Sequence, residues 1–180
     1  MNIIRGFHGT NKDSAEKIKQ EGFDIKLINE NIYKKPNKVR WLGQGAYFFE
    51  NNLDCANKWA EVFNTNPSVV EGIIHFEDKD IFDVTQPYSP HAIVFEQERE
   101  VILKNAKNRK LDIKTTMAGL DGKIFDQICR KMNYKVVKAS TYTPFDLCRE
   151  NKVKSNISNV VEVCVRDKNY IKEIDIISSR

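Results

Sequence analysis

The chain has 180 residues, of which 41% are hydrophobic, and its formal net charge is +4. This length and composition suffice for one compact domain with its own core, so we expect a single domain over residues 1–180. No apolar run is long enough to span a bilayer and the N-terminus lacks a secretory signal pattern, so we expect a cytoplasmic protein without a membrane partner.

The basic and acidic residues are interspersed along the chain, which permits a nucleic-acid partner but does not imply one. The cysteines are scattered singly, without a C-x-x-C pair and without histidine at ligand spacing. This pattern argues against a zinc site and against a disulfide framework, so we expect no metal. We expect buried or unreactive thiols at Cys55, Cys129, Cys148 and Cys164.

The first part of the chain predicts a strand, a turn and a short helix. Residues 2–7 are strand-like and lead into a His-Gly-Thr turn. Asp13 and Glu16 form a capping-box-like helix start, and Gly22 can end that helix. The polar segment 26–38, rich in Asn and Lys, predicts a loop.

A second strand–helix unit follows, and then a third strand. Residues 46–49 predict a strand, Asp54 is placed to cap a helix, and residues 69–76 predict another strand. One face of the expected helix is apolar and carries Ala56, Trp59, Ala60 and Phe63.

The second half of the chain predicts helices followed by strands. Residues 95–107 and 122–132 have helical periodicity, whereas residues 134–138, 160–166 and 171–177 are strand-like. Strands therefore dominate both ends of the chain, with helices between them, and this order predicts an α+β fold.

Several short motifs lie in a distinctive order along the chain. They are His8-Gly9-Thr10, the Gly-x-Tyr-Phe unit at residues 45–48, the small-residue helix start Cys55-Ala56, and Glu162 within an apolar strand. In this order they resemble the ADP-ribosyltransferase superfamily, specifically its His-Tyr-Glu branch, which contains diphtheria toxin and the poly(ADP-ribose) polymerases. Residues 162–167 are similar to that branch's Glu-x-apolar-Val-x-Asp phrase, and the ordered set spans most of the chain.

The resemblance implies a fold in which split, bent antiparallel sheets surround an NAD cleft, with helices at the periphery. It implies NAD as co-substrate, release of nicotinamide, and single transfer of ADP-ribose to a macromolecular acceptor, either protein or nucleic acid. Small stand-alone transferases of this kind are often toxins or defence effectors, so a neutralising partner protein is also implied.

The expected chemistry explains the residue types. Cleavage of the bond between nicotinamide and ribose creates an oxocarbenium-like ribose, which Glu162 can stabilise from an apolar strand. Tyr47 offers an aromatic face for the cationic nicotinamide. Gly9 lets its backbone approach the carboxamide, and Thr10 supports the turn. The resemblance implies that His8 hydrogen-bonds the adenosine ribose.

The chain departs from the family pattern near the expected second helix. The family's second nicotinamide-flanking aromatic residue falls at Lys58, and Trp59 is its neighbour. Either Trp59 stacks on the nicotinamide or it belongs to the core. Cys55 stands where polymerase relatives hold the carboxamide with serine, and a thiol is a weaker hydrogen-bonding group. Gly45 fits either the cofactor site or an ordinary turn.

Other interpretations remain open. Water in place of the acceptor gives an NAD glycohydrolase, and loss of chemistry gives a module that only binds NAD or ADP-ribose; a purely structural protein is a third alternative. Strand alternation leaves a solvated outer face as the alternative for Glu162. The Arg-Ser-Glu branch of the superfamily fits less well, because it has Glu or Gln where Val160 stands, although Arg5 and Ser140 are suitably ordered.

Overall fold

The computed structural model describes the chain except residues 35–37, 39, 114, 146–149, 153–154 and 178–180. Its strands are β1 (Asn2–Asn11), β2 (Ala46–Glu50), β3 (Pro67–Phe76), β4 (Ile81–Asp83), β5 (Val136–Thr141), β6 (Val160–Val165) and β7 (Ile171–Ile177). Its α-helices are α1 (Lys12–Glu21), α2 (Leu53–Phe63), α3 (Pro90–Asn108) and α4 (Met117–Met132), and short 3₁₀ turns span Asp78–Asp80 and Lys168–Tyr170.

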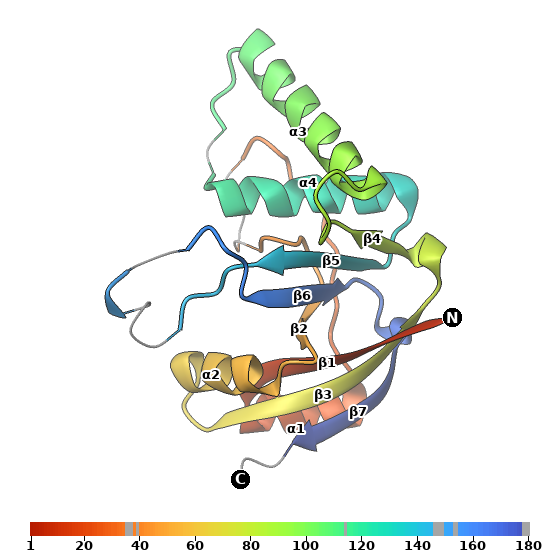
Figure 1. Ribbon diagram of the computed structural model, residues 1–180, viewed down its shortest axis with the longest axis vertical. Helices are drawn as coiled ribbons and strands as arrows, with labels where there is room; N and C mark the ends of the chain where they lie inside the picture. Colours follow the sequence, from red (N-terminus) through yellow and green to blue (C-terminus); the bar gives the residue numbers. More distant parts are fainter. Residues whose placement is uncertain (35–37, 39, 114, 146–149, 153–154, 178–180) are drawn as a thin grey trace.

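The described strands form one seven-stranded sheet in the order β4-β5-β6-β2-β1-β3-β7. Neighbouring strands run antiparallel except β4 and β5, which are parallel. In Figure 1, α3 and α4 lie over the β4-β5-β6 end of the sheet, α2 lies beside β1 and β3, and α1 lies behind the β3-β7 end. The expected α+β class is confirmed.

The predicted helices and strands all form, but three details of the prediction are wrong. His8, Gly9 and Thr10 do not form a turn, because β1 continues through them to Asn11 and pairs with β3 there. The side chain of Asn11, not Asp13, caps α1 by accepting a hydrogen bond from the Ser14 amide at 2.8 Å. Likewise, Asn52 caps α2 by accepting from the Cys55 amide at 3.0 Å, so Asp54 lies within the first turn. Both aspartates still lie near the positive end of their helix dipoles.

The core lies on both faces of the sheet. One cluster packs against α1 on one face, and two others lie under α2 and α4 on the opposite face. The buried side chains of β6 divide accordingly: Val163 and Val165 belong to the α1 side, Val160 to the α2 cluster and Cys164 to the α4 cluster. The sheet is therefore covered on both sides near β6, so a hydrophobic run rather than strict alternation is favoured there.

The sheet is nearly divided between β1 and β2. Within the described chain, these strands pair only at Gly6 with Glu50 and at Phe7 with Phe49. In contrast, β1 pairs with β3 over its whole length from Asn2 to Asn11. The strands β2, β4, β5 and β6 thus form one half and β1, β3 and β7 the other, and the halves separate beyond Phe7.

Two further expectations concern the thiols and the membrane. Cys129 and Cys164 are buried and Cys55 is partly buried, all three as free thiols, whereas Cys148 lies outside the described residues. Among the described helices, none combines the length and apolar character needed to cross a membrane.

Candidate functional site

A pocket opens where β1 and β2 separate. Its volume is about 740 Å³, within the range typical of small-molecule sites. Of the residues expected at the NAD site, His8, Gly9, Thr10, Gly45, Tyr47, Trp59 and Glu162 line this pocket. Cys55 is not among the described lining residues; its side chain packs with the core under α2. Residues from distant parts of the chain therefore meet at one cavity.

Glu162 is buried rather than solvated. It pairs with Phe49 of β2 and Ala139 of β5, and only 3% of it is exposed. On its face of β6 it lies between Val160, which packs under α2, and Cys164, which packs under α4. The carboxylate thus lies in the gap between two helix-covered cores, and the alternative of a solvated outer face is wrong.

The carboxylate of Glu162 is held by neutral donors. The indole Nε1 of Trp41 donates to Oε2, and Oγ1 of Thr143 donates to Oε1 at 3.4 Å. Burial raises the pKa of Glu162 from an ordinary value of 4.5 to about 7, and these hydrogen bonds oppose the rise. The pocket therefore contains a carboxyl group that ionises near neutral pH, as functional carboxyl groups often do.

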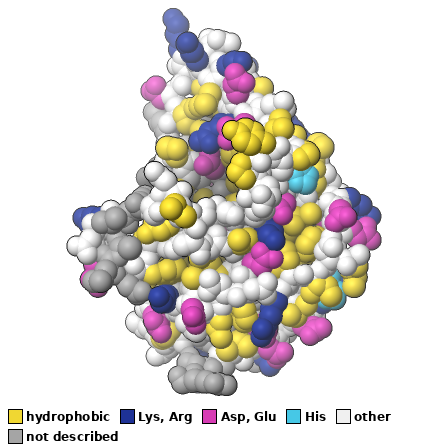
Figure 2. All heavy atoms as spheres, viewed as in Figure 1, with side chains coloured by type: hydrophobic (Ala, Val, Ile, Leu, Met, Phe, Trp, Pro, Cys, Tyr) yellow, Lys and Arg dark blue, Asp and Glu magenta, His cyan; other side chains and the backbone are white. Residues whose placement is uncertain are grey.

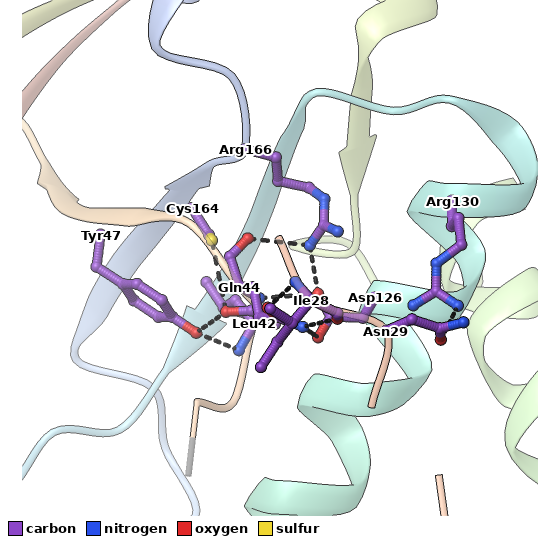
Figure 3. A network of polar contacts seen from close by, with 10 residues as sticks. Ile28, Asn29, Leu42, Gln44, Tyr47, Asp126, Arg130, Cys164 and Arg166 are labelled. Carbon is purple, nitrogen blue, oxygen red and sulfur yellow. Dashed lines mark hydrogen bonds and ion pairs between the residues drawn. The ribbon is translucent and has the colours of Figure 1, made fainter. Parts of the chain in front are cut away.

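The Tyr47 ring is fixed through its hydroxyl. The hydroxyl accepts a hydrogen bond from the Leu42 amide at 2.9 Å and donates to the Gly43 carbonyl at 2.8 Å (Figure 3). Burial raises its pKa well above the ordinary range, so the phenol stays protonated. Tyr47 is consequently suited to present a rigid aromatic surface to a ligand and not to transfer a proton.

Trp41 joins the aromatic residues of the pocket. Its ring centroid lies 6.1 Å from that of Tyr47 and 6.2 Å from that of Trp59, nearly perpendicular to both. Such edge-to-face contacts favour a fixed arrangement of the three rings. Trp59 thus lies at the pocket, whereas Lys58 is exposed and is absent from the described lining.

Sequence reasoning missed Trp41. The available signal was an aromatic residue immediately before the glycine-flanked start of β2, at Leu42-Gly43-Gln44-Gly45. That signal is weak, because a tryptophan beside a turn is commonly an ordinary packing residue. Its contact with Glu162 depends on how the described residues next to it, residues 40–45, lie over the sheet.

His8 bridges the separating strands. Its Nδ1 lies 2.7 Å from the backbone carbonyl oxygen of Tyr47. Burial lowers its pKa, and the ammonium group of Lys38 acts in the same direction, so the ring is neutral at pH 7. Nδ1 then carries the proton that it donates to the carbonyl, which leaves Nε2 as an acceptor for a ligand hydroxyl.

Gly9 is required by the packing of α2. A Cβ atom at this position would lie 2.3 Å from the Ala56 carbonyl oxygen and 3.0 Å from the Ala60 nitrogen, both in α2. The missing side chain therefore lets the helix backbone lie directly on β1. Gly9 also lines the pocket, where its suggested contact with a carboxamide stays a prediction.

A buried polar network supports the segment before β2. Asp126 of α4 accepts hydrogen bonds from the Gln44 amide at 2.8 Å and from the Arg166 guanidinium, which also donates to the Gln44 carbonyl at 3.0 Å (Figure 3). These groups are nearly inaccessible to solvent. The network ties α4, β6 and the residues that hold the Tyr47 hydroxyl into one unit.

The lining of the pocket also contains charged residues. The basic ones are Lys17, Lys38, Arg40 and Lys168, and acidic ones include Glu21 and Asp24 of the α1 region. Lys17 lies 3.9 Å from Glu21 on the surface of α1. Basic residues outnumber acidic ones in the described lining even with Glu162 included, which favours an anionic group in the ligand.

The comparisons with known proteins add no family assignment. No protein-family model matches this chain, and no curated protein matches its sequence at a significant level. The case for a function therefore depends on the residues and geometry of the pocket.

Proposed function

We propose that this chain is an NAD-dependent mono-ADP-ribosyltransferase that moves ADP-ribose to a macromolecular acceptor and releases nicotinamide. The observation that carries the proposal is the buried carboxyl group of Glu162 in the same pocket as Tyr47, Trp59 and His8. His8, Tyr47 and Glu162 are the residues that the resemblance to the His-Tyr-Glu branch singled out, and Trp59 is the aromatic residue for which stacking on the nicotinamide was left open. The split between β1 and β2 at this pocket also supports the proposal of an ADP-ribosyltransferase-like fold.

The proposed reaction breaks the bond between the nicotinamide nitrogen and the ribose anomeric carbon. The electron pair leaves with nicotinamide, which becomes neutral, and the ribose acquires oxocarbenium character. A nucleophilic atom of the acceptor then bonds to the anomeric carbon and gives up its proton. The ionised carboxylate of Glu162 stabilises the transient cation, and burial strengthens that electrostatic effect.

The other lining residues suit the remaining parts of NAD. The rings of Tyr47 and Trp59 offer aromatic surfaces for the nicotinamide, and a stacked cation contributes roughly 0.5 to 2 kcal/mol. Nε2 of His8 is available to accept a hydrogen bond from a ribose hydroxyl. The basic lining residues Lys17, Lys38, Arg40 and Lys168 suit the diphosphate.

The acceptor is proposed only as a class, a protein or a nucleic acid. Figure 2 shows acidic and basic side chains interspersed over the face that it displays, without a broad basic area. Charge on this face therefore favours neither kind of acceptor. A role as a toxin or defence effector in the cytoplasm, held in check by a neutralising partner protein, is part of the same proposal and depends on the resemblance.

Incubation of the purified protein with NAD labelled in the adenine moiety tests the proposal. We expect the protein to release nicotinamide. In the presence of a cell lysate, we expect labelled macromolecules, and loss of the label on digestion with either protease or nuclease would show whether the acceptor is protein or nucleic acid. Free ADP-ribose as the sole product would instead identify an NAD glycohydrolase. Bound but uncleaved NAD would identify a binding module, and the absence of both binding and cleavage would contradict every NAD-dependent function.

A further inference from the structure

The hydrogen bond between Trp41 and Glu162 has a role that the residue pattern did not suggest. The Trp41 indole donates to Oε2 of Glu162. Among the described residues, the other carboxylate oxygen, Oε1, accepts a longer hydrogen bond, 3.4 Å from the Thr143 hydroxyl. The two oxygens of the carboxylate are therefore unequal, one firmly held and the other weakly held.

The position of Trp41 is itself fixed by its surroundings. Its ring meets the rings of Tyr47 and Trp59 edge to face, at interplanar angles of 87° and 85°. The next residue, Leu42, donates its amide to the Tyr47 hydroxyl. The rings of Tyr47 and Trp59 contact the indole, and the hydrogen bond of the Leu42 amide fixes the adjoining backbone. The indole N–H group can therefore hold the carboxylate in one orientation.

We propose that Trp41 is the positioning residue of Glu162: its indole N–H fixes Oε2 so that Oε1 is presented to the ligand in the pocket. The inference rests on the proposed function, in which Oε1 would accept a hydrogen bond from a ribose hydroxyl beside the reacting carbon. It assigns to this residue of the irregular segment before β2 a direct part in orienting the reactive carboxylate.

The same hydrogen bond favours the ionised form of Glu162. Burial raises the pKa of Glu162, and among the groups that lower it Trp41 acts most strongly, followed by Thr143 and Thr141. These three neighbours are neutral. The titratable groups on adjacent elements, the Tyr47 phenol on β2 and the Cys55 thiol on α2, both have pKa values raised by burial and stay uncharged near neutral pH.

Trp41→Phe tests the inference because it keeps an aromatic ring but removes the N–H donor, together with part of the ring volume. The rate of NAD cleavage should rise with pH as Glu162 ionises. In Trp41→Phe we expect this rise to occur about one pH unit higher, because loss of a charge-assisted hydrogen bond makes ionisation of Glu162 less favourable. Trp59→Phe is the matched control: it alters another aromatic wall of the pocket, so it should raise KM without moving this limb.

A second measurement needs no NAD and no folded variant of Trp41. In wild-type protein with ¹⁵N-labelled indoles, the Trp41 N–H resonance should shift with pH around a midpoint of about 7, the pKa of Glu162. In Glu162→Gln this transition should vanish. Absence of the indole transition, or coincident pH profiles for Trp41→Phe and wild type, overturns the inference. If wild type cleaves no NAD, the proposed function fails, and the indole transition alone decides whether Trp41 holds Glu162.

Discussion

The side chain of His8 on β1 contacts the backbone of Tyr47 on β2, with 2.7 Å between Nδ1 and the carbonyl oxygen, at the point where the two strands stop pairing. A side chain here replaces the backbone hydrogen bonds that the separating strands no longer make. The pocket can therefore open between β1 and β2 while the two halves of the sheet stay connected. His8 consequently has both a structural contact, through Nδ1, and a second ring nitrogen, Nε2, that can accept a hydrogen bond from a ligand.

Substitution of His8 separates these two roles. His8→Ala removes the bridge to the Tyr47 carbonyl and should lower the free energy of unfolding by about 1 kcal/mol. His8→Asn retains a donor near the position of Nδ1 and should be more stable than His8→Ala. Both variants lack Nε2 and should bind NAD about tenfold more weakly, which corresponds to about 1.4 kcal/mol.

Calorimetric titration in a Glu162→Gln background measures this binding without turnover, and urea denaturation measures stability. If His8→Asn bound NAD as tightly as the parent protein, Nε2 would have no role in holding the ligand.

The network around Asp126 should be essential for stability. Asp126→Asn leaves the guanidinium of Arg166 buried without its counter-charge, and loss of one partner of a buried ion pair typically costs about 3 kcal/mol or more. Because the same carboxylate holds the Gln44 amide, NAD affinity should also fall.

Lys104→Met is the matched control, since it breaks an exposed ion pair with Glu100 on α3 and should change stability by less than about 1 kcal/mol. Thermal unfolding of the two variants side by side checks the expectation. Equal melting temperatures would show that the buried network contributes no more than a surface pair.

The raised pKa of Glu162 predicts an unusual dependence of stability on pH. In the folded protein this carboxyl group holds its proton up to about pH 7, whereas its ordinary pKa is 4.5. The folded state thus binds more protons than the unfolded state between these values, and Glu162 lowers the stability of the wild type as pH rises through this interval.

Glu162→Gln cannot ionise, so it should be as stable as wild type at pH 4 and more stable at pH 8, by at most about 3 kcal/mol. Urea denaturation across this pH range provides the measurement, with Glu100→Gln, which changes an exposed carboxylate on α3, as the control. A constant difference between Glu162→Gln and wild type at every pH would argue that Glu162 has an ordinary pKa.

The sequence predicted the α+β class and the type of each long element, because hydrophobic periodicity is clear over stretches such as Leu53–Phe63, where Ala56 and Ala60 fall on the buried face. It did not predict β4, because the three residues Ile81–Asp83 are too few to carry a period and their pairing with β5 is a long-range contact. The helix caps were misplaced for a different reason. β1 continues to Asn11, so α1 begins directly after it. Asn11, whose backbone is extended, therefore caps the helix, and Asp13 lies inside the first turn.

The candidate site was predictable in part. Motifs at His8, Tyr47 and Glu162 pointed to residues that do line one pocket. The contribution of Trp41 was not predictable, because the described residues between Gly22 and Gly45 form no helix or strand whose period would indicate which side chains face inward. The burial of Glu162 also depended on tertiary structure, since it arises from α2 and α4 covering the same face of β6.

We propose that the negative charge of Glu162 drives cleavage of NAD. The most direct measurement compares nicotinamide release by wild type and Glu162→Gln under single-turnover conditions, with the NAD-induced rise in melting temperature recorded for both proteins. We predict a loss of cleavage of about 100-fold to 1,000-fold in Glu162→Gln, with the thermal stabilisation by NAD retained. Equal rates of nicotinamide release by the two proteins, or no stabilisation of either by NAD, would contradict the account.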